Sequence, residues 1–241
     1  MWFFDWAIRL MVVAVALTGL LQVGPVILSS GDIGDNYYDA PPPVVSEQTT
    51  WLGLFIKKGT SDQETRESHL EVTRVRFVPR KESGPTVYRL VTAPPGAVLL
   101  LSGVPRLSAG AAITVSQDVD LGGEKREAEF SLGSRRYRIR LDSKEPNYCD
   151  AVISLTQGGR RQKLFDAAGP GTTNDPALVV SCDEPHFTVH WAGDLDRDGR
   201  LDMLVTFSQK YSYHPRQLFL SSGARSGELV SQVARYDRFA E

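Results

Sequence analysis

Four aspartates fall within nine positions of the segment AGDLDRDGRLDMLV, with Gly199 directly after the third. Carboxylates at this density repel one another unless water or a cation lies between them. Spacing by two in a curled loop turns successive carboxylates toward one centre, and the glycine permits the sharp bend that such a loop needs. Hard oxygen ligands suit Ca²⁺ better than Zn²⁺ or copper. The segment predicts a Ca²⁺ site, and the alternative is a solvated acidic turn. The four residues are Asp194, Asp196, Asp198 and Asp202.

The residues around this segment indicate which kind of calcium loop it is. Its first nine positions match an EF-hand loop, but Val205 stands where a bidentate glutamate is required, and both flanks alternate like strands. The strand–loop–strand pattern D-x-D-x-D-G-x-x-D resembles the calcium loop of FG-GAP and VCBS-type repeats. A β-propeller needs several copies of that repeat, and this chain has one. The C-terminal passage also resembles the end of uncharacterised exported bacterial proteins. The resemblance implies five ligands: Asp194, Asp196, Asp198, the main-chain carbonyl of Arg200, and Asp202.

An apolar run over residues 10–28 predicts export. It holds no charged residue, it is close to the length that spans a bilayer, and it forms a predicted hydrophobic helix. Arg9 precedes it and three aspartates follow within residues 32–39, so the positive-inside tendency leaves the N-terminus in the cytoplasm. Residues 1–30 are therefore either a cleaved signal peptide or a membrane anchor. We expect the rest of the chain to be periplasmic or extracellular.

The two cysteines are interpreted in the light of that location. Cys149 and Cys182 are the only pair and neither belongs to a CxxC motif. In an oxidising compartment they are expected to form one disulfide, and the alternative is two buried free thiols. Neither cysteine lies in surroundings that would activate a thiolate.

The remaining sequence predicts an all-β fold, mainly antiparallel and arranged as a sandwich or a barrel-like sheet. Short alternating segments recur every eight to twelve residues between Gly, Pro, Asp and Ser clusters. Hairpin turns are expected at Gly133–Ser134 and Gly158–Gly159. A Pro-rich linker (31–50) should lead to a β-rich domain (51–185) and a strand–loop–strand calcium module (186–241) packed on it. The predicted strands are 69–78, 87–92, 97–102, 111–116, 128–132, 136–141, 151–156, 161–167 and 177–181.

Charge argues against a nucleic-acid partner. The formal net charge is −2, which gives no broad electrostatic attraction for phosphates. Basic residues do cluster at 135–140 and 158–163. The first cluster alternates arginine with apolar residues, as a strand with one buried and one wet face does. A solvated face is one interpretation of these clusters, and binding of an anionic ligand is the other.

No catalytic centre emerges from the sequence. The G-x-S-x-G, Walker A, G-x-G-x-x-G and HExxH motifs are absent. His186 and His190 share one face of an expected strand, where a metal site with Asp183 or Glu184 competes with ordinary surface roles. The leading hypothesis is an exported, calcium-stabilised structural or binding protein without its own catalysis. The alternatives are a module that binds a carbohydrate or a protein beside the loop, with Trp191, Tyr211 and Tyr213 as a stacking platform, and an envelope hydrolase with unidentified acids.

Overall fold

The fold is all-β, as the sequence predicts. The computed structural model describes residues 26–29, 37–38, 51–57, 69–80 and 87–91 as strands, and then residues 99–123, 125–168 and 182–237. Every regular element in these residues is a β-strand, and none is a helix. All the strand pairings are antiparallel apart from one isolated bridge between Asp183 and Lys210.

The strands form three sheets. The first contains β1 (Val26–Ser29), β6 (Leu99–Ser102), β3 (Trp51–Lys57), β4 (His69–Arg80), β5 (Val87–Val91) and β2 (Tyr37–Tyr38) in that order, with β7 (Gly110–Ala111) beside β4. The second contains β12 (Arg160–Asp166), β11 (Val152–Gln157), β10 (Arg135–Asp142) and β9 (Glu127–Leu132). The third contains β16 (Ser231–Tyr236), β15 (Arg216–Leu220), β14 (Asp202–Ser208), β13 (His186–Asp194) and β8 (Ile113–Asp120).

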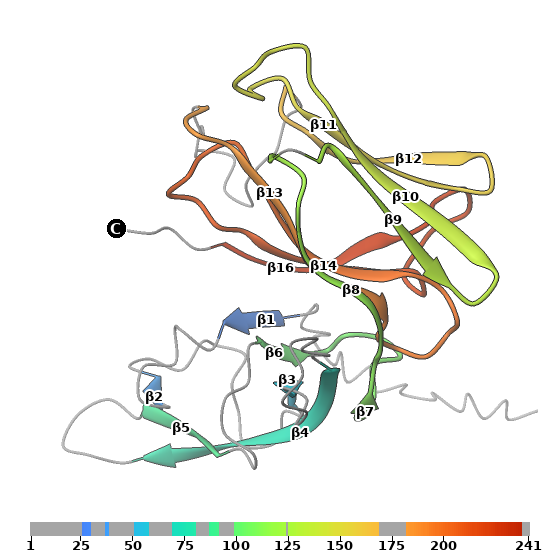
Figure 1. Ribbon diagram of the computed structural model, residues 1–241. Helices are drawn as coiled ribbons and strands as arrows, with labels where there is room; N and C mark the ends of the chain where they lie inside the picture. The colour runs from blue at the N-terminus through green and yellow to red at the C-terminus, as the bar shows by residue number, and fades with distance from the viewer. Residues whose placement is uncertain are drawn as a thin grey trace, which may run out of the picture.

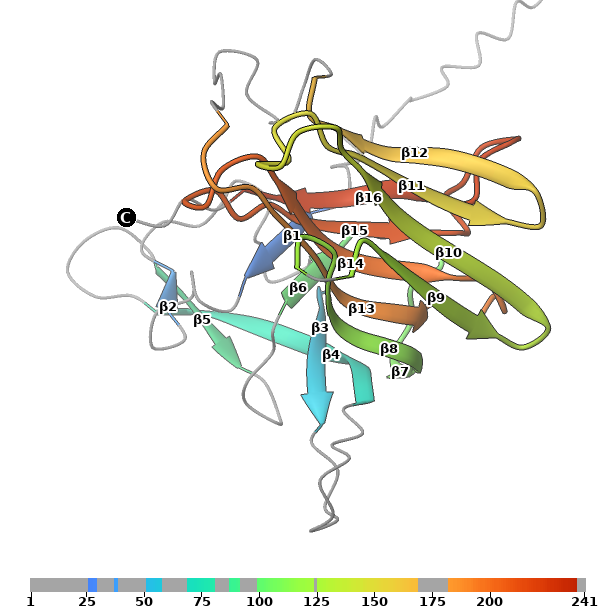
Figure 2. The same cartoon turned by 45° about the horizontal axis from the view of Figure 1, so that its top comes forward.

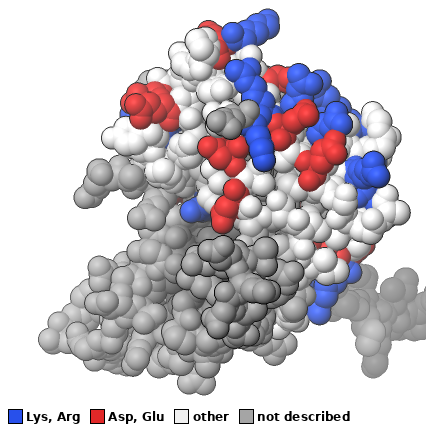
Figure 3. Space-filling view, viewed as in Figure 1, with Lys and Arg blue, Asp and Glu red and all other residues white. Residues whose placement is uncertain are grey.

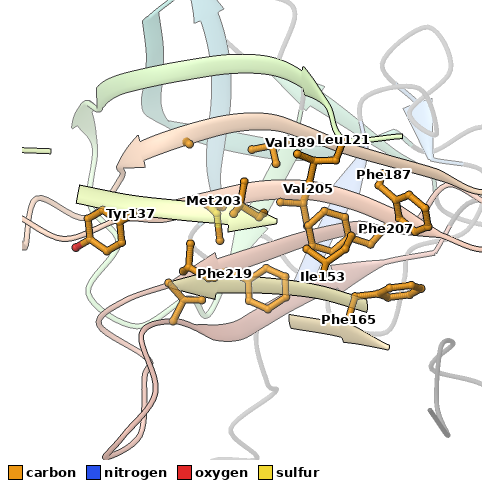
Figure 4. Close-up of a cluster of buried hydrophobic side chains, with 14 of the residues drawn as sticks. Leu121, Tyr137, Ile153, Phe165, Phe187, Val189, Met203, Val205, Phe207 and Phe219 are labelled. Atoms are coloured by element: carbon orange, nitrogen blue, oxygen red, sulfur yellow. The ribbon is translucent and has the colours of Figure 1, made fainter. Parts of the chain in front are cut away.

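The third sheet lies between the other two (Figures 1 and 2). One hydrophobic core joins it to the β9–β12 sheet and includes Ile139, Ile153, Phe187 and Val205 (Figure 4). A second core joins its opposite face to β3 and β6 and includes Leu54, Leu101, Trp191, Leu204 and Leu218. Strand β14 is consequently buried at all seven positions, because a strand covered on both faces has no side for water.

Both predicted hairpin turns are confirmed. Leu132 pairs with Arg135 across Gly133–Ser134, and Gln157 pairs with Arg160 across Gly158–Gly159. The two glycines of the second turn have φ values of 56° and 81°. This left-handed conformation matches a two-residue turn to the twist of its strands. These turns place β9 beside β10 and β11 beside β12.

The predicted strands correspond closely to observed ones, apart from two regions. The segment expected at 111–116 is divided between β7, which ends at Ala111, and β8, which begins at Ile113 and extends to Asp120. Strand 177–181 lies outside the described residues. Strand β8 belongs to the predicted 51–185 unit but pairs with β13 of the predicted 186–241 unit. One sheet therefore draws strands from both sides of the predicted boundary.

The predicted N-terminal helix is corrected at its C-terminal end. Residues 26–28, expected to complete the apolar helix, belong to strand β1, which pairs with β6. Strand β1 lies at the edge of its sheet, and valine and isoleucine are residues with a high preference for strands. Residues 1–25 of that helix and most of the 31–50 linker lie outside the described residues. In the part of the chain that is described, no helix has the length and hydropathy to cross a bilayer.

The disulfide prediction is confirmed. Cys149 and Cys182 are bonded, with Cα atoms 5.6 Å apart. The bond connects the turn region after β10 to the residue that precedes the Asp183 bridge and β13. It therefore links the second sheet to the third from outside their shared core.

Candidate metal centre

The centre of the aspartate-rich segment, residues 195–201, forms the hairpin loop between β13 and β14. Asp194 ends β13 and Asp202 begins β14. Within the loop, Arg197 and Gly199 have φ values of 63° and 75°, so the backbone curls twice through the left-handed region. The sharp bend predicted at Gly199 is confirmed. A strand–loop–strand arrangement without helices also confirms that this is not an EF-hand.

Close packing at Gly193 fixes the base of the loop. A Cβ at this position would lie 1.9 Å from the carbonyl oxygen of Ile113 in β8 and 2.5 Å from Cζ2 of Trp191. Only glycine fits, because the backbones of β8 and β13 approach each other here at a register shift. Because Gly193 has no side chain, the backbone of β8 packs directly against β13 up to Asp194, where the loop begins.

Three of the predicted ligands converge. Asp194, Asp196 and Asp202 each place a carboxylate oxygen within 4.8 Å of the other two. Asp194 is 1% exposed and Asp202 is 0% exposed, so bulk solvent does not screen these two charges from each other. Among the described residues no other group of three His, Cys, Asp or Glu side chains is arranged to hold a metal.

Backbone amides of the loop orient two of these carboxylates. Asp194 accepts hydrogen bonds from the N–H groups of Asp198 at 3.0 Å and Gly199 at 2.9 Å. Asp202 accepts the N–H of Leu195 at 2.8 Å through one oxygen and that of Ser221 at 2.8 Å through the other. Each carboxylate oxygen has a second lone pair. The carboxylates are therefore held in place while retaining acceptor capacity.

Asp196 is the incompletely satisfied member of the group. Its Oδ2 accepts the hydroxyl of Ser222, whereas its Oδ1 is buried and has no hydrogen-bond partner among the described residues. A buried, unpaired carboxylate oxygen is costly, and it calls for a cation or a proton. The residues therefore fit a metal ion, because an all-oxygen donor set with an orphaned acceptor matches a hard cation.

Asp198 and Arg200 lie next to this group but are engaged with other partners. The Asp198 carboxylate accepts the hydroxyl of Ser221 at 2.9 and 3.0 Å and the backbone N–H of Arg200 at 2.8 Å. It also forms an ion pair of 2.7 Å with the Arg200 guanidinium. Asp198 thus connects the β13–β14 loop to the turn after β15. Its role as a ligand, and that of the Arg200 carbonyl, stay predictions.

Groups outside the loop also form hydrogen bonds with it. Arg135 donates to the carbonyl oxygen of Gly199, and the backbone N–H of Leu201 donates to the hydroxyl of Tyr137 at 3.4 Å. The Arg197 guanidinium donates to the carbonyl oxygen of Ala109 at 3.2 Å. No pattern in the sequence predicted the contacts of these residues with the loop, or those of Ser221 and Ser222. Their separations of 19 to 88 positions follow no local pattern that would have identified them.

Burial also changes the protonation of the site. Burial, together with the charges of Asp196 and Asp198, raises the pKa of Asp202 to about 7, against the opposing hydrogen bonds from Ser221 and Leu195. Without a cation, Asp202 therefore takes up a proton near neutral pH. A bound cation would favour the ionised carboxylate instead.

His186 and His190 do not form the metal site that was the alternative to ordinary surface roles. The Arg216 guanidinium lies against Nε2 of His190, which also contacts the Thr206 hydroxyl at 2.9 Å, so that nitrogen is occupied. Burial, followed by the Arg216 charge, lowers the pKa of His190 to about 3. Burial, followed by the neighbouring His214, lowers the pKa of His186 to about 4. These rings are neutral packing groups at physiological pH.

The aromatic platform proposed beside the loop does not form. Trp191 is 2% exposed and donates its indole N–H to Thr114 at 2.9 Å, and Tyr213 is 1% exposed. Only Tyr211 is exposed among the three. Trp191 and Tyr213 are therefore packing residues of the fold, and Tyr211 alone does not make a stacking platform.

Comparisons of the chain with protein-family models, with curated proteins and with solved structures found no match. The resemblance to FG-GAP and VCBS-type loops accordingly rests on the sequence of the loop.

Proposed function

We propose that this protein is an exported β-protein that Ca²⁺ stabilises, with a structural or binding role and no catalytic centre of its own. The observation that carries the proposal is the buried, partnerless Oδ1 of Asp196 beside the carboxylates of Asp194 and Asp202. Three carboxylates held this close in a region of low polarity repel one another. A divalent cation relieves that repulsion and uses the orphaned acceptor.

The proposed role of the ion is to join two parts of the central sheet. Asp194 and Asp202 belong to the β13–β14 hairpin, while Ser221 and Ser222, which hold the acidic side chains, belong to the turn after β15. Asp194, Asp196 and Asp202 would supply oxygen ligands. Ca²⁺ is favoured over Mg²⁺, because Mg²⁺ requires tight octahedral geometry and loses its water reluctantly.

The proposed location is outside the cytoplasm. The Cys149–Cys182 disulfide supports an oxidising compartment, since such bonds persist mainly in secreted and periplasmic proteins. The uncharged run at residues 10–28 supports export, either as a signal peptide or as an anchor in the inner membrane. A location outside the cytoplasm also suits a calcium site, because extracellular modules bind Ca²⁺ weakly at about 10⁻⁴–10⁻³ M.

Thermal unfolding of the full-length protein tests the calcium proposal. With a dissociation constant of ~0.1 mM, 1 mM Ca²⁺ would stabilise the fold by about 1.4 kcal/mol. The melting temperature should rise by a few degrees, a chelator should reverse the rise, and Mg²⁺ should substitute poorly. A melting curve that neither Ca²⁺ nor chelator changes would show that the loop is a metal-free acidic turn.

A further inference from the structure

The two arginine-rich segments of the sequence meet on one face of the β9–β12 sheet. Strand β10 pairs with β11 so that Arg138 faces Thr156 and Arg140 faces Ser154. Tyr137 and Ile139 of β10 point into the core, so the arginines that alternate with them point away from it. Figure 3 shows basic and acidic side chains interleaved over this part of the molecule.

A groove of about 340 Å³ runs across this outer face. Its size falls in the range of small-molecule sites, and β10 and β11 are the inner strands of their sheet, which makes its floor rigid. Ser154 is only 3% exposed although it belongs to the outer face, so it lies low in the groove. The principal lining side chains are Arg136, Arg138, Arg140, Arg161, Ser154 and Thr156.

The arginines of the groove are only partly neutralised. Arg138 pairs with Glu129 at 2.6 Å, while Arg140 and Arg161 share one acid, Asp142, at 2.8 Å each. Their side chains remain 53%, 58% and 60% exposed, respectively. The Arg136 guanidinium has no hydrogen-bond or ion-pair partner in the part of the chain that the structure describes. Each guanidinium carries five donors, so most of them face solvent unpaired.

We propose that this groove binds a carboxylate-bearing polysaccharide. Guanidinium groups recognise planar carboxylates through paired hydrogen bonds, and the hydroxyls of Ser154 and Thr156 and the amide of Gln157 match sugar hydroxyl groups. The arginine side chains of the site lie on the face of β10 opposite to the side chains of Arg135 and Tyr137, which contact the β13–β14 loop. The inference therefore stands independently of the calcium proposal.

Other anionic partners fit this groove less well. The backbones of β10 and β11 are already paired on both sides, so an acidic peptide cannot add as a further strand there. The one aromatic residue of the lining, Tyr137, is 4% exposed and offers no surface on which bases could stack. Ile113 and Tyr211, the exposed large apolar residues in the described part of the chain, are not part of the lining, which argues against insertion into a membrane.

Calorimetric titration of the full-length protein in calcium-free buffer tests this proposal, with oligogalacturonate as the probe. Neutral dextran oligosaccharide of similar length tests the need for charge, and polyglutamate tests the need for a sugar. We expect saturable binding of oligogalacturonate alone. Arg136→Glu should weaken it by at least about tenfold, because it reverses the charge of the unpaired guanidinium. Lys125→Glu makes the same change of charge at an exposed residue outside the groove and should leave affinity within about twofold.

Three outcomes would overturn the proposal. The first is no saturable binding of oligogalacturonate to the wild-type protein. The second is equal binding of polyglutamate, which would identify an acidic-peptide site. The third is an equal loss of affinity in Arg136→Glu and Lys125→Glu, which would indicate attraction by overall charge. Circular dichroism and a melting curve that match those of the wild type confirm that each variant is folded.

Discussion

The carboxylate of Asp202 accepts the backbone N–H of Ser221 at 2.8 Å, although the two residues are 19 positions apart. Asp202 begins β14, and Ser221 directly follows β15, which pairs with β14. The same carboxylate accepts the N–H of Leu195 in the hairpin loop. One buried acid therefore connects two loops at the same end of the central sheet. The ionisation of Asp202 should consequently affect both loops together.

Removal of the charge of Asp196 should abolish the calcium response. In Asp196→Asn the orphaned acceptor loses its negative charge, so affinity should fall by about tenfold or more. The metal-free variant should be at least as stable as the wild type, since it relieves repulsion with Asp194 and Asp202. Melting curves with Ca²⁺ and with chelator measure both effects.

The matched control for this variant is Asp118→Asn. Asp118 is exposed, distant in sequence from the loop, and has a φ of 49°, a conformation that asparagine tolerates. It should retain the full response to Ca²⁺. An Asp196→Asn protein that Ca²⁺ still stabilises as much as the wild type would remove Asp196 from the ligand set.

Calcium affinity should depend on pH through Asp202. The pKa of Asp202 is raised to about 7 in the metal-free fold, so below that pH the ion must displace a proton. The dissociation constant should be about tenfold larger at pH 6 than at pH 8, where the carboxylate is already ionised. Titration by calorimetry at both values measures the ratio. Equal constants would mean that Asp202 is ionised throughout and is not protonated near neutral pH.

Acidification should destabilise the protein through His190. The folded-state pKa of about 3 lies below the ordinary value of 6.5, so the unfolded chain takes up a proton between these limits and the folded protein does not. The contribution of His190 to stability is complete above pH 6.5 and is lost as pH falls toward 3. At pH 5 the loss relative to pH 7 is at most about 2 kcal/mol.

Comparison with His190→Gln isolates this effect. Glutamine still offers an oxygen acceptor to Arg216 and does not titrate. The contribution of Asp202 to stability changes with pH in the opposite direction, because its pKa is raised, and it is common to both proteins. Urea unfolding at pH 7 and pH 5 should show the difference in unfolding free energy between wild type and variant shrinking as the pH falls. A difference independent of pH would contradict the assignment of a neutral, buried His190.

Reduction of the disulfide should destabilise the fold. A loop of this length contributes roughly 3–4 kcal/mol in the chain-entropy model, so the reductant should lower the melting temperature by several degrees. The double variant Cys149→Ser/Cys182→Ser should melt near the reduced wild type and be insensitive to reductant. Native protein whose thiols react with an alkylating reagent before reduction would contradict the bond.

Export is tested by a reporter fused after residue 50. The uncharged run at residues 10–28 and the charges on either side of it should carry the reporter across the membrane, so a reporter that folds only in an oxidising compartment should be active. Two arginines introduced into the run should abolish that activity. Activity of a cytoplasm-specific reporter in the same fusion would place the protein inside the cell.

The sequence alone determined the elements whose signals are local. Alternation of apolar and polar residues along β10 predicted a strand with one wet face, because side chains of a strand point to opposite sides in turn. Gly158–Gly159 predicted a two-residue turn, because that turn requires positive φ values. The spacing of four aspartates predicted a convergent group of acids in one short hairpin loop, and Asp194, Asp196 and Asp202 of the four converge.

Only the tertiary structure decided how these elements meet. It buried both faces of β14, joined β8 to β13, and brought Ser221 and Ser222 to the acidic loop. It also left Asp198 paired with Arg200 and Ser221 beside the three converging carboxylates. The arginine clusters at 135–140 and 158–163 became one groove because β11 pairs with both β10 and β12. Such contacts depend on how sheets pack, and the periodicity of a single segment carries no information about the segment that will cover it.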